Sequence, residues 1–219
     1  MFEVSYSSLA QVIKCPKSWL CKINGYETHD FKWFKEGKDI HAIIQEHVSG
    51  TKEHSFLTQC GITKDYHFPM VEEKDFDEKM KFTFEVVADG VPFLMRGYLD
   101  GLNPEIKRGL EIKSGSALWS LGDFIKSPQR RIYALALDLK DMLLITVKRD
   151  MNLWETDPKR SLKKYLVPTT ELDKKSAMEF IKLGCHIILK SEYKAPENRN
   201  CFNCIYKGSC EDSLCLNRR

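Results

Sequence analysis

The sequence lacks any long apolar run: no stretch approaches the roughly 18 residues needed to cross a bilayer, so we expect no membrane span. The N-terminal Met-Phe-Glu-Val-Ser-Tyr has no basic stretch followed by an apolar one, so we predict no secretion signal and a cytoplasmic protein. A Gly-x-x-x-x-Gly-Lys-Ser/Thr loop is also missing, which excludes a nucleotide-driven motor of the common phosphate-loop kind.

A strong excess of one charge is missing too, since 34 Lys+Arg face 31 Asp+Glu and the net charge is +3. This balance does not identify a partner, because a basic groove can coexist with a neutral total. The 219 residues are 42% hydrophobic and 30% charged, which excludes a disordered or collagen-like chain. The length suits one domain, and we expect a single domain over residues 1–219.

Apolar spacing predicts a mixed α/β fold. Helices are expected over 5–14, about 34–48, about 128–139 and 170–190. Strands are expected over 81–88, 92–102, 109–114 and 142–148, with a turn at Asp89-Gly90. Residues 49–70 show weak periodicity and are expected to form a loop with short helical pieces. This order of elements predicts a central mixed β-sheet flanked by helices.

Two carboxylates and a lysine form the most informative cluster. Glu111 and Lys113 share a face of their strand. If residues 103–108 close a hairpin, Asp100 lies opposite Glu111, with the Cβ atoms ~5 Å apart. Such a pair needs a cation, and oxygen ligands favour Mg²⁺ or Mn²⁺, beside which Lys113 would hold or deprotonate a water for attack on a phosphodiester. A surface hairpin with solvated charges gives the same short pattern.

Further residues extend this cluster. Gln129 and Tyr133 lie four apart on the helix that begins after Ser127, so they share a face. The ordered set resembles the RecB-like branch of the PD-(D/E)xK nuclease superfamily, and it consists of His41, Gly97-x-x-Asp100, Glu111-x-Lys113 and Gln129-x-x-x-Tyr133.

The resemblance implies a restriction-endonuclease-like core and metal-dependent cleavage of DNA. It also implies that Lys113 positions the attacking water, and that Gln129 and Tyr133 steady this lysine and the DNA. In this branch an acidic residue on the preceding strand often assists, and Glu72 and Glu73 are both candidates. The metal ligands implied by the resemblance are His41, Asp100, Glu111 and the Ile112 carbonyl.

Eight cysteines are unusual for a chain without a secretion signal, and four of them lie close together near the C-terminus: Cys201, Cys204, Cys210 and Cys215. This clustering indicates a metal site. If Cys215 is the fourth ligand, zinc is the natural choice. If the fourth ligand is a distant cysteine, a [4Fe–4S] cluster is favoured, and Cys15 is the distant candidate.

One cysteine near the N-terminus and three near the C-terminus, around a RecB-like core, resemble the iron–sulfur nucleases, among them the CRISPR-associated iron–sulfur exonucleases and their viral relatives. The resemblance implies a nuclease core over about 34–150, with a Cys-rich tail within 170–219 packed against the helix in 1–33. The implied cluster ligands are Cys15, Cys201, Cys204 and Cys210. Cys215 departs from the pattern, so zinc remains an alternative, and the cytoplasm would be the host's if the chain is viral. Packing roles are expected for Cys21, Cys60 and Cys185.

Basic residues near the predicted site, Lys126, Arg130 and Arg131, are expected to contact DNA phosphates. Trp119 and Phe124 either stack on bases or lie in the core, and we favour the core. The sequence thus predicts a Mg²⁺- or Mn²⁺-dependent DNA exonuclease acting on single strands or ends. Recombination, repair or CRISPR adaptation would be its setting, with a helicase or other protein of those processes as partner. The alternative is a non-catalytic nucleic-acid-binding module with a structural zinc site.

Overall fold

The computed structural model describes residues 1–26, 32–62, 81–150 and 152–190, together with Tyr206 and Cys210. The chain forms two compact units. The first, which we call the terminal unit, comprises residues 1–32, 84–96 and 179–219. The second, the core unit, comprises residues 33–83 and 97–178.

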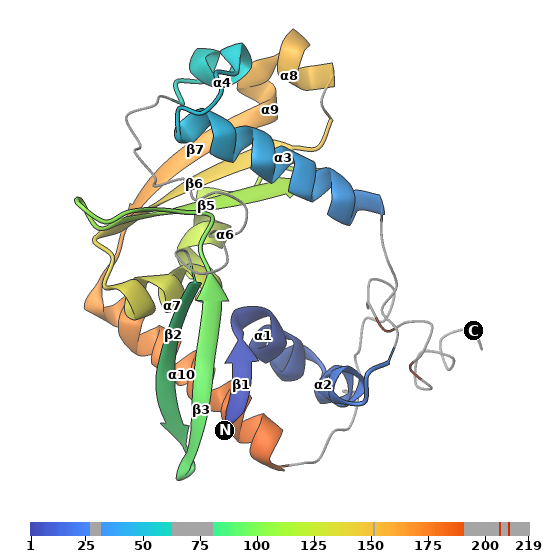
Figure 1. Ribbon diagram of the computed structural model, residues 1–219, viewed down its shortest axis with the longest axis vertical. Helices are drawn as coiled ribbons and strands as arrows, with labels where there is room; N and C mark the ends of the chain where they lie inside the picture. The colour runs from blue at the N-terminus through green and yellow to red at the C-terminus, as the bar shows by residue number, and fades with distance from the viewer. Residues whose placement is uncertain (27–31, 63–80, 151, 191–205, 207–209, 211–219) are drawn as a thin grey trace. The chain divides into compact units, whose positions relative to one another are not determined.

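The terminal unit contains a three-stranded sheet in the order β1-β3-β2, with β1 (Phe2–Ser5) parallel to β3 (Val91–Tyr98) and β2 (Lys81–Ala88) beside β3 (Figure 1). The last two strands extend into the core unit. Asp89 and Gly90 join them with φ values of 50° and 78°, as a tight two-residue hairpin turn requires. The predicted turn is therefore confirmed, whereas β1 is too short to show the alternation that predicts a strand.

Two helices follow β1 in the terminal unit, α1 (Tyr6–Lys14) and α2 (Pro16–Ile23). Ser5 caps α1, because its hydroxyl accepts a hydrogen bond from the Ser8 N–H and the Ser8 hydroxyl accepts one from the Ser5 N–H. Cys15 separates the helices in an extended conformation, as expected before a proline. The predicted start and end of this helix are confirmed.

The core unit contains a four-stranded mixed sheet in the order β4-β5-β6-β7, whose central pair β5–β6 is parallel while the outer pairs are antiparallel. The strands are β4 (Gly101–Asn103), β5 (Arg108–Gly115), β6 (Asp141–Lys148) and β7 (Leu162–Pro168). The mixed α/β class is thus confirmed. Sequence patterning did not predict β7, which lies at the edge of the sheet.

Helices cover this sheet. The long helix α3 (Lys32–Val48) lies across one face, where Ile40, Ile44 and Val48 join a buried cluster that includes Ile112 (Figure 1). The helix α7 (Pro128–Leu137) packs against β5 and β6. The described residues also form the helices α4 (Ser55–Gln59), α6 (Leu121–Lys126), α8 (Asn152–Thr156), α9 (Pro158–Ser161) and α10 (Glu171–Lys190), the last belonging partly to each unit.

The predicted continuous strand over residues 92–102 is wrong. The chain leaves β3 after Tyr98, bends at Leu99 and Asp100, and enters a different sheet at β4. In β4, Gly101 pairs with Leu110, so Asp100 still reaches the level of Glu111. The apolar alternation runs through the bend and conceals it.

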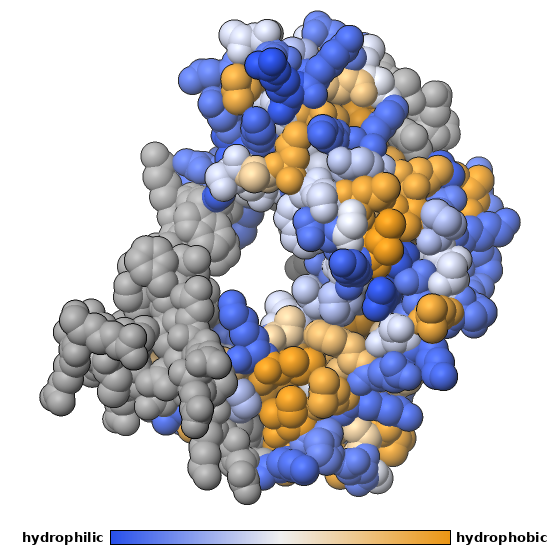
Figure 2. Space-filling model, turned by 180° about the vertical axis from the view of Figure 1, so that it is seen from behind, coloured by the Kyte–Doolittle hydropathy of each residue, from blue (hydrophilic) through white to orange (hydrophobic). Residues whose placement is uncertain are grey.

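The described residues include no helix long and apolar enough to cross a membrane. On the face shown in Figure 2, hydrophobic residues lie among hydrophilic ones.

Candidate active site

The site begins where β5 continues beyond its pairing with β4. In this strand Leu110 and Ile112 belong to the apolar cluster with α3, so Glu111 and Lys113 lie on the opposite face of the sheet. The short strand β4 pairs only with residues 108–110. Beyond it, the Ile112 N–H donates to Asp100 Oδ2 at 2.7 Å. Since the N–H and C=O of one strand residue point to the same side, the Ile112 carbonyl also faces Asp100.

Helix α3 contributes two side chains to Asp100. His41 Nδ1 lies 3.3 Å from Asp100 Oδ1. One turn later, Gln45 Nε2 donates to the Asp100 backbone carbonyl at 2.8 Å. Burial lowers the pKa of His41, but the hydrogen bond and charge of Asp100, together with the charge of Glu111, outweigh it and leave this pKa raised. The His41 imidazole therefore interacts electrostatically with both carboxylates, Asp100 and Glu111.

Glu111 is the most enclosed charge of the site, with its side chain only 5% exposed. Its Oε1 forms an ion pair with Lys113 Nζ. Burial raises the pKa of Glu111 well above its usual range, the Lys113 ammonium opposes this rise, and the Asp100 carboxylate adds to it. A carboxylate in these surroundings favours a nearby positive charge.

Lys113 begins a chain of hydrogen bonds that ends on the backbone. Its Nζ donates to Gln129 Oε1, Gln129 Nε2 donates to the Tyr133 hydroxyl, and that hydroxyl donates to the Tyr98 carbonyl, each at 2.7 Å. Gln129 and Tyr133 are one turn apart on α7, so this helix holds the lysine from the face opposite α3.

Gly97 allows close packing near the end of this series of hydrogen bonds. The Phe82 ring meets the Tyr133 ring edge-on, with centroids 5.6 Å apart. It also lies over Gly97, where an added Cβ would fall 2.3 Å from Phe82 Cζ. The glycine of the Gly-x-x-Asp motif is therefore explained by close packing beneath Phe82.

The donor set fits a divalent cation by its chemistry. His41, Asp100, Glu111 and the Ile112 carbonyl supply mostly oxygen ligands of the kind that Mg²⁺ and Mn²⁺ prefer. Among the described residues, however, no three His, Cys, Asp or Glu side chains are already grouped as a metal cage. In this structure Asp100 accepts a hydrogen bond from Ile112, and Glu111 pairs with Lys113.

A comparison with protein families identifies the superfamily of this chain. The PD-(D/E)XK nuclease superfamily model matches residues 3–211. The chain belongs to this superfamily. The crystal structure of SSO0001 resembles this nuclease fold with a TM-score of 0.52 at 14% identity, over 98% of this chain and 88% of the other. That likeness concerns the fold alone.

Two further structures show weaker likeness to this superfamily member. A phage-related exonuclease from Haemophilus somnus 129PT is 16% identical, with a TM-score of 0.34 over 87% of this chain and 96% of that one. Scheffersomyces stipitis Rai1, in complex with (3'-NADP)+ and a calcium ion, is 11% identical, with a TM-score of 0.30 over 90% and 62%. No curated protein matches the chain.

The three residues expected to contact DNA differ in their exposure to solvent. Arg130 is only 1% exposed, forms an ion pair with Asp173, and donates to the Ile125 carbonyl at 3.1 Å. A phosphate could not reach it without displacing these partners, so its burial contradicts the predicted DNA contact. Arg131 is partly exposed and Lys126 is exposed, so both remain candidates in this nuclease.

The two aromatic residues before Gln129 also differ. Phe124 is buried, as predicted. The expectation that Trp119 lies in the core is wrong, because it is partly exposed and its ring lies 5.3 Å from Lys113 Nζ.

Two of the predicted cysteine ligands, Cys15 and Cys210, lie within the described residues and belong to the terminal unit. Cys15 and Cys210 are partly exposed, while Cys201, Cys204 and Cys215 lie outside the described residues, as do the acidic candidates Glu72 and Glu73. The expected packing cysteines Cys21 and Cys185 are buried, and Cys60 packs against the apolar cluster.

Sequence reasoning missed two supporting residues. Gln45 lies four residues after His41, and this helical spacing was a signal that it shares the His41 face. The Tyr98 carbonyl gave no such signal, because any residue supplies a backbone acceptor.

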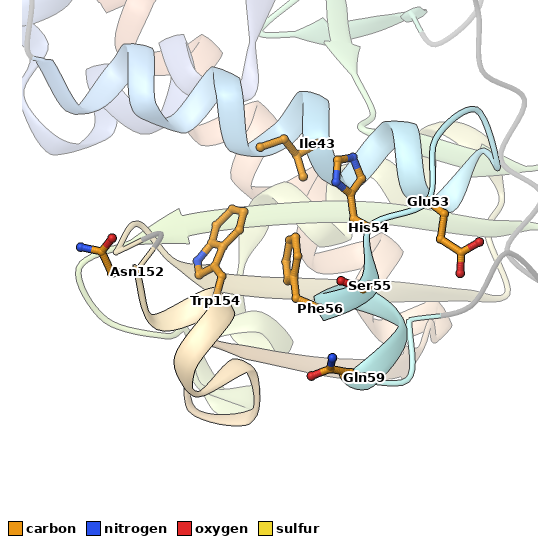
Figure 3. A pocket seen from close by; sticks show the side chains of 8 residues that line it. All are labelled: Ile43, Glu53, His54, Ser55, Phe56, Gln59, Asn152 and Trp154. Carbon is orange, nitrogen blue, oxygen red and sulfur yellow. The ribbon is translucent and has the colours of Figure 1, made fainter.

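A pocket of about 620 Å³ lies elsewhere in the core unit, and Figure 3 shows the side chains that line it, which come from α3, α4, α8 and the segment before α4. Phe56 and Trp154 form an aromatic pair there, with ring centroids 4.8 Å apart. Its lining contains Glu53 and, among the described residues, no lysine or arginine that could pair with a phosphate. None of its lining residues belongs to the Asp100–Glu111 site.

Proposed function

We propose that the chain is a Mg²⁺- or Mn²⁺-dependent deoxyribonuclease. The observation that carries this proposal lies within one compact unit, where Asp100 meets His41 and Lys113 contacts both Glu111 and Gln129. A protein that only binds DNA has no need for a buried carboxylate beside a hydrogen-bonded lysine. Membership of the nuclease superfamily supports the proposal.

Each residue has a defined task in the proposed reaction. His41, Asp100, Glu111 and the Ile112 carbonyl would hold the cation, which when bound neutralises charge developing on the phosphate. Lys113 would hold the attacking water through Nζ. The hydrogen bonds from Nζ through Gln129 to Tyr133 would keep Nζ in place, which lowers the entropic cost of reaching the reactive geometry.

The finer proposal is an exonuclease acting on single strands or DNA ends in the cytoplasm, in recombination, repair or CRISPR adaptation, with a helicase or related protein as partner. The resemblance to RecB-like nucleases supports it, and the exposed Lys126 and the partly exposed Arg131 supply cations for the DNA backbone.

End-labelled single-stranded, duplex and circular DNA, incubated with Mg²⁺, Mn²⁺ or EDTA, tests the proposal. We expect metal-dependent release of nucleotides from linear DNA and none from the circles. Cleaved circles would replace the exonuclease with an endonuclease. DNA binding without cleavage under any metal would support the alternative, a non-catalytic module with a zinc site.

We further propose that Cys15, Cys201, Cys204 and Cys210 hold a [4Fe–4S] cluster with a structural role. Their spacing supports this, and the two ligands within the described residues, Cys15 and Cys210, belong to one compact unit and are partly exposed. Iron and sulfide analysis of anaerobically purified protein is the test. We expect four irons per chain, lost in Cys204→Ser and kept in Cys215→Ser. Bound zinc that Cys215→Ser removes would overturn the assignment.

A further inference from the structure

Trp119 lies against the predicted catalytic lysine. Its ring centroid is 5.3 Å from Lys113 Nζ, within the ~6 Å over which a cation is attracted to an aromatic face. Its side chain is neither in the core nor fully exposed. The ring is therefore available to hold the ammonium group at the surface of the site.

The backbone of Trp119 is fixed by the strand next to the lysine. The Trp119 N–H donates to Thr146 Oγ1 at 2.9 Å, and Thr146 is fully buried. In the parallel β5–β6 register, Thr146 is the direct partner of Lys113. The same point of the sheet thus sets the positions of both the lysine and the tryptophan.

The contact between Trp119 and Lys113 becomes more important when Glu111 binds a cation. The Lys113 ammonium has three donors, and its partners include Glu111, Gln129 and the Trp119 ring. A Glu111 carboxylate that binds a cation offers less charge to Lys113. Gln129 and the ring then hold Nζ, the first as a neutral acceptor and the second through its negative face.

We infer that Trp119 is a positioning residue for Lys113, holding its ammonium group in the reactive place through the indole face. The inference rests on the proposed function, because it assigns to Trp119 the task of supporting the lysine of that site. Stacking of the indole on an unpaired base is a different role, with a different kinetic signature.

Steady-state cleavage by Trp119→Leu and Trp119→Phe separates the two roles. Leucine removes the aromatic face, so we expect kcat to fall about 3- to 30-fold with KM for DNA changed less than twofold. Phenylalanine keeps a face and should restore most of kcat. A raised KM with unchanged kcat in Trp119→Leu would show base stacking and overturn the inference.

A measurement without DNA or metal distinguishes failure of this inference from failure of the proposed function. In protein labelled with ¹³C at the lysine ε-carbon, the ring current of Trp119 should move the Lys113 ε-CH₂ signal upfield, and Lys113→Arg identifies that signal. Trp119→Leu should abolish the shift and Thr146→Val, which removes the acceptor for Trp119 N–H, should reduce it. A Lys113 signal unaffected by Trp119→Leu would overturn the inference even in an active nuclease. A shift that both variants change would support the contact even if the protein cleaves no DNA.

Discussion

The carboxylate of Asp100 accepts the Ile112 N–H at 2.7 Å, beyond the last residue of β5 that pairs with β4. Its second oxygen lies 3.3 Å from His41 on α3. The Asp100 side chain therefore accepts a backbone N–H of β5 and also connects this strand to helix α3. Asp100 is needed both for the local structure and for the proposed chemistry, so its removal alone cannot separate the two. Glu111 allows a cleaner test.

Glu111→Gln should abolish metal-dependent cleavage, by at least about 100-fold in kcat, because the amide keeps the size of the side chain and loses the charge that would hold the cation. DNA affinity without metal should stay within about twofold. Glu105→Gln, an exposed change in the turn of the same hairpin, is the control and should cleave normally. Full activity in Glu111→Gln would refute the proposed site.

Tyr133→Phe should weaken both stability and turnover. The hydroxyl bonds to Gln129 and to the Tyr98 carbonyl, and losing such bonds costs about 1–2 kcal/mol of unfolding free energy. Release of Gln129 should lower kcat about 10-fold, since Lys113 then loses a fixed acceptor. Urea unfolding and steady-state kinetics check both effects, with Tyr165→Phe on β7 as control. Unchanged kcat would show that the hydrogen-bond chain does not support catalysis.

Asp173→Ala should destabilise the core unit by about 3–5 kcal/mol, because it leaves the buried Arg130 guanidinium without its anion. Burial raises the pKa of Asp173, but hydrogen bonds and charge from Arg130, with hydrogen bonds from Thr170, outweigh it and hold this pKa low. A lowered folded-state pKa means that the stabilisation is complete above about pH 4 and is lost as the pH falls further.

The pH dependence of this ion pair can be measured by urea unfolding between pH 7 and pH 3. Wild-type protein should lose stability toward acid more steeply than Asp173→Asn, which has no proton to gain. Asp39→Asn, an exposed change on α3, should follow the wild-type curve. Parallel curves for wild type and Asp173→Asn would contradict the assigned role.

Gly184→Ala tests packing in the terminal unit. Within an exposed helix this change gains up to about 1 kcal/mol. On α10, however, the new Cβ would lie 2.8 Å from Cδ2 of the fully buried Leu9 and 3.2 Å from its Cβ. Overpacking costs about 1–3 kcal/mol, so we expect a net loss in the unfolding midpoint. Gly122→Ala on α6 is the matched control, because its Cβ meets only an ordinary contact at 3.7 Å, and a stabilised Gly184→Ala would contradict the packing.

Local patterns predicted the elements whose signals are local. The end of α1 before Cys15, the proline start of α7 at Pro128 and the apolar run of β6 all lie where the sequence predicted them. Counting residues across the β4–β5 turn also brought Asp100 to the level of Glu111, as the Gly101–Leu110 pair requires.

Features that depend on distant partners escaped prediction. The bend at Leu99 and Asp100 exists because β3 and β4 pair with different strands, and the apolar pattern of the segment does not record that change. Arg130 carries the charge of a surface residue, but Asp173, 43 positions away, allows its burial. The strands that pair with β3 and β4, and the Asp173 partner of Arg130, cannot be recognised from the sequence next to these elements.

The turn between β4 and β5 has a consequence for how the chain tolerates changes of length. Asn103 Oδ1 accepts the N–H groups of Glu105 and Ile106 at 3.1 and 3.3 Å, which fixes a compact loop. Eight paired positions hold β5 to β6. A residue inserted into the loop would therefore shift Asp100 against Glu111 while the β5–β6 pair stayed in place. Substitutions at 104–107 should be accepted far more readily than an insertion or deletion there.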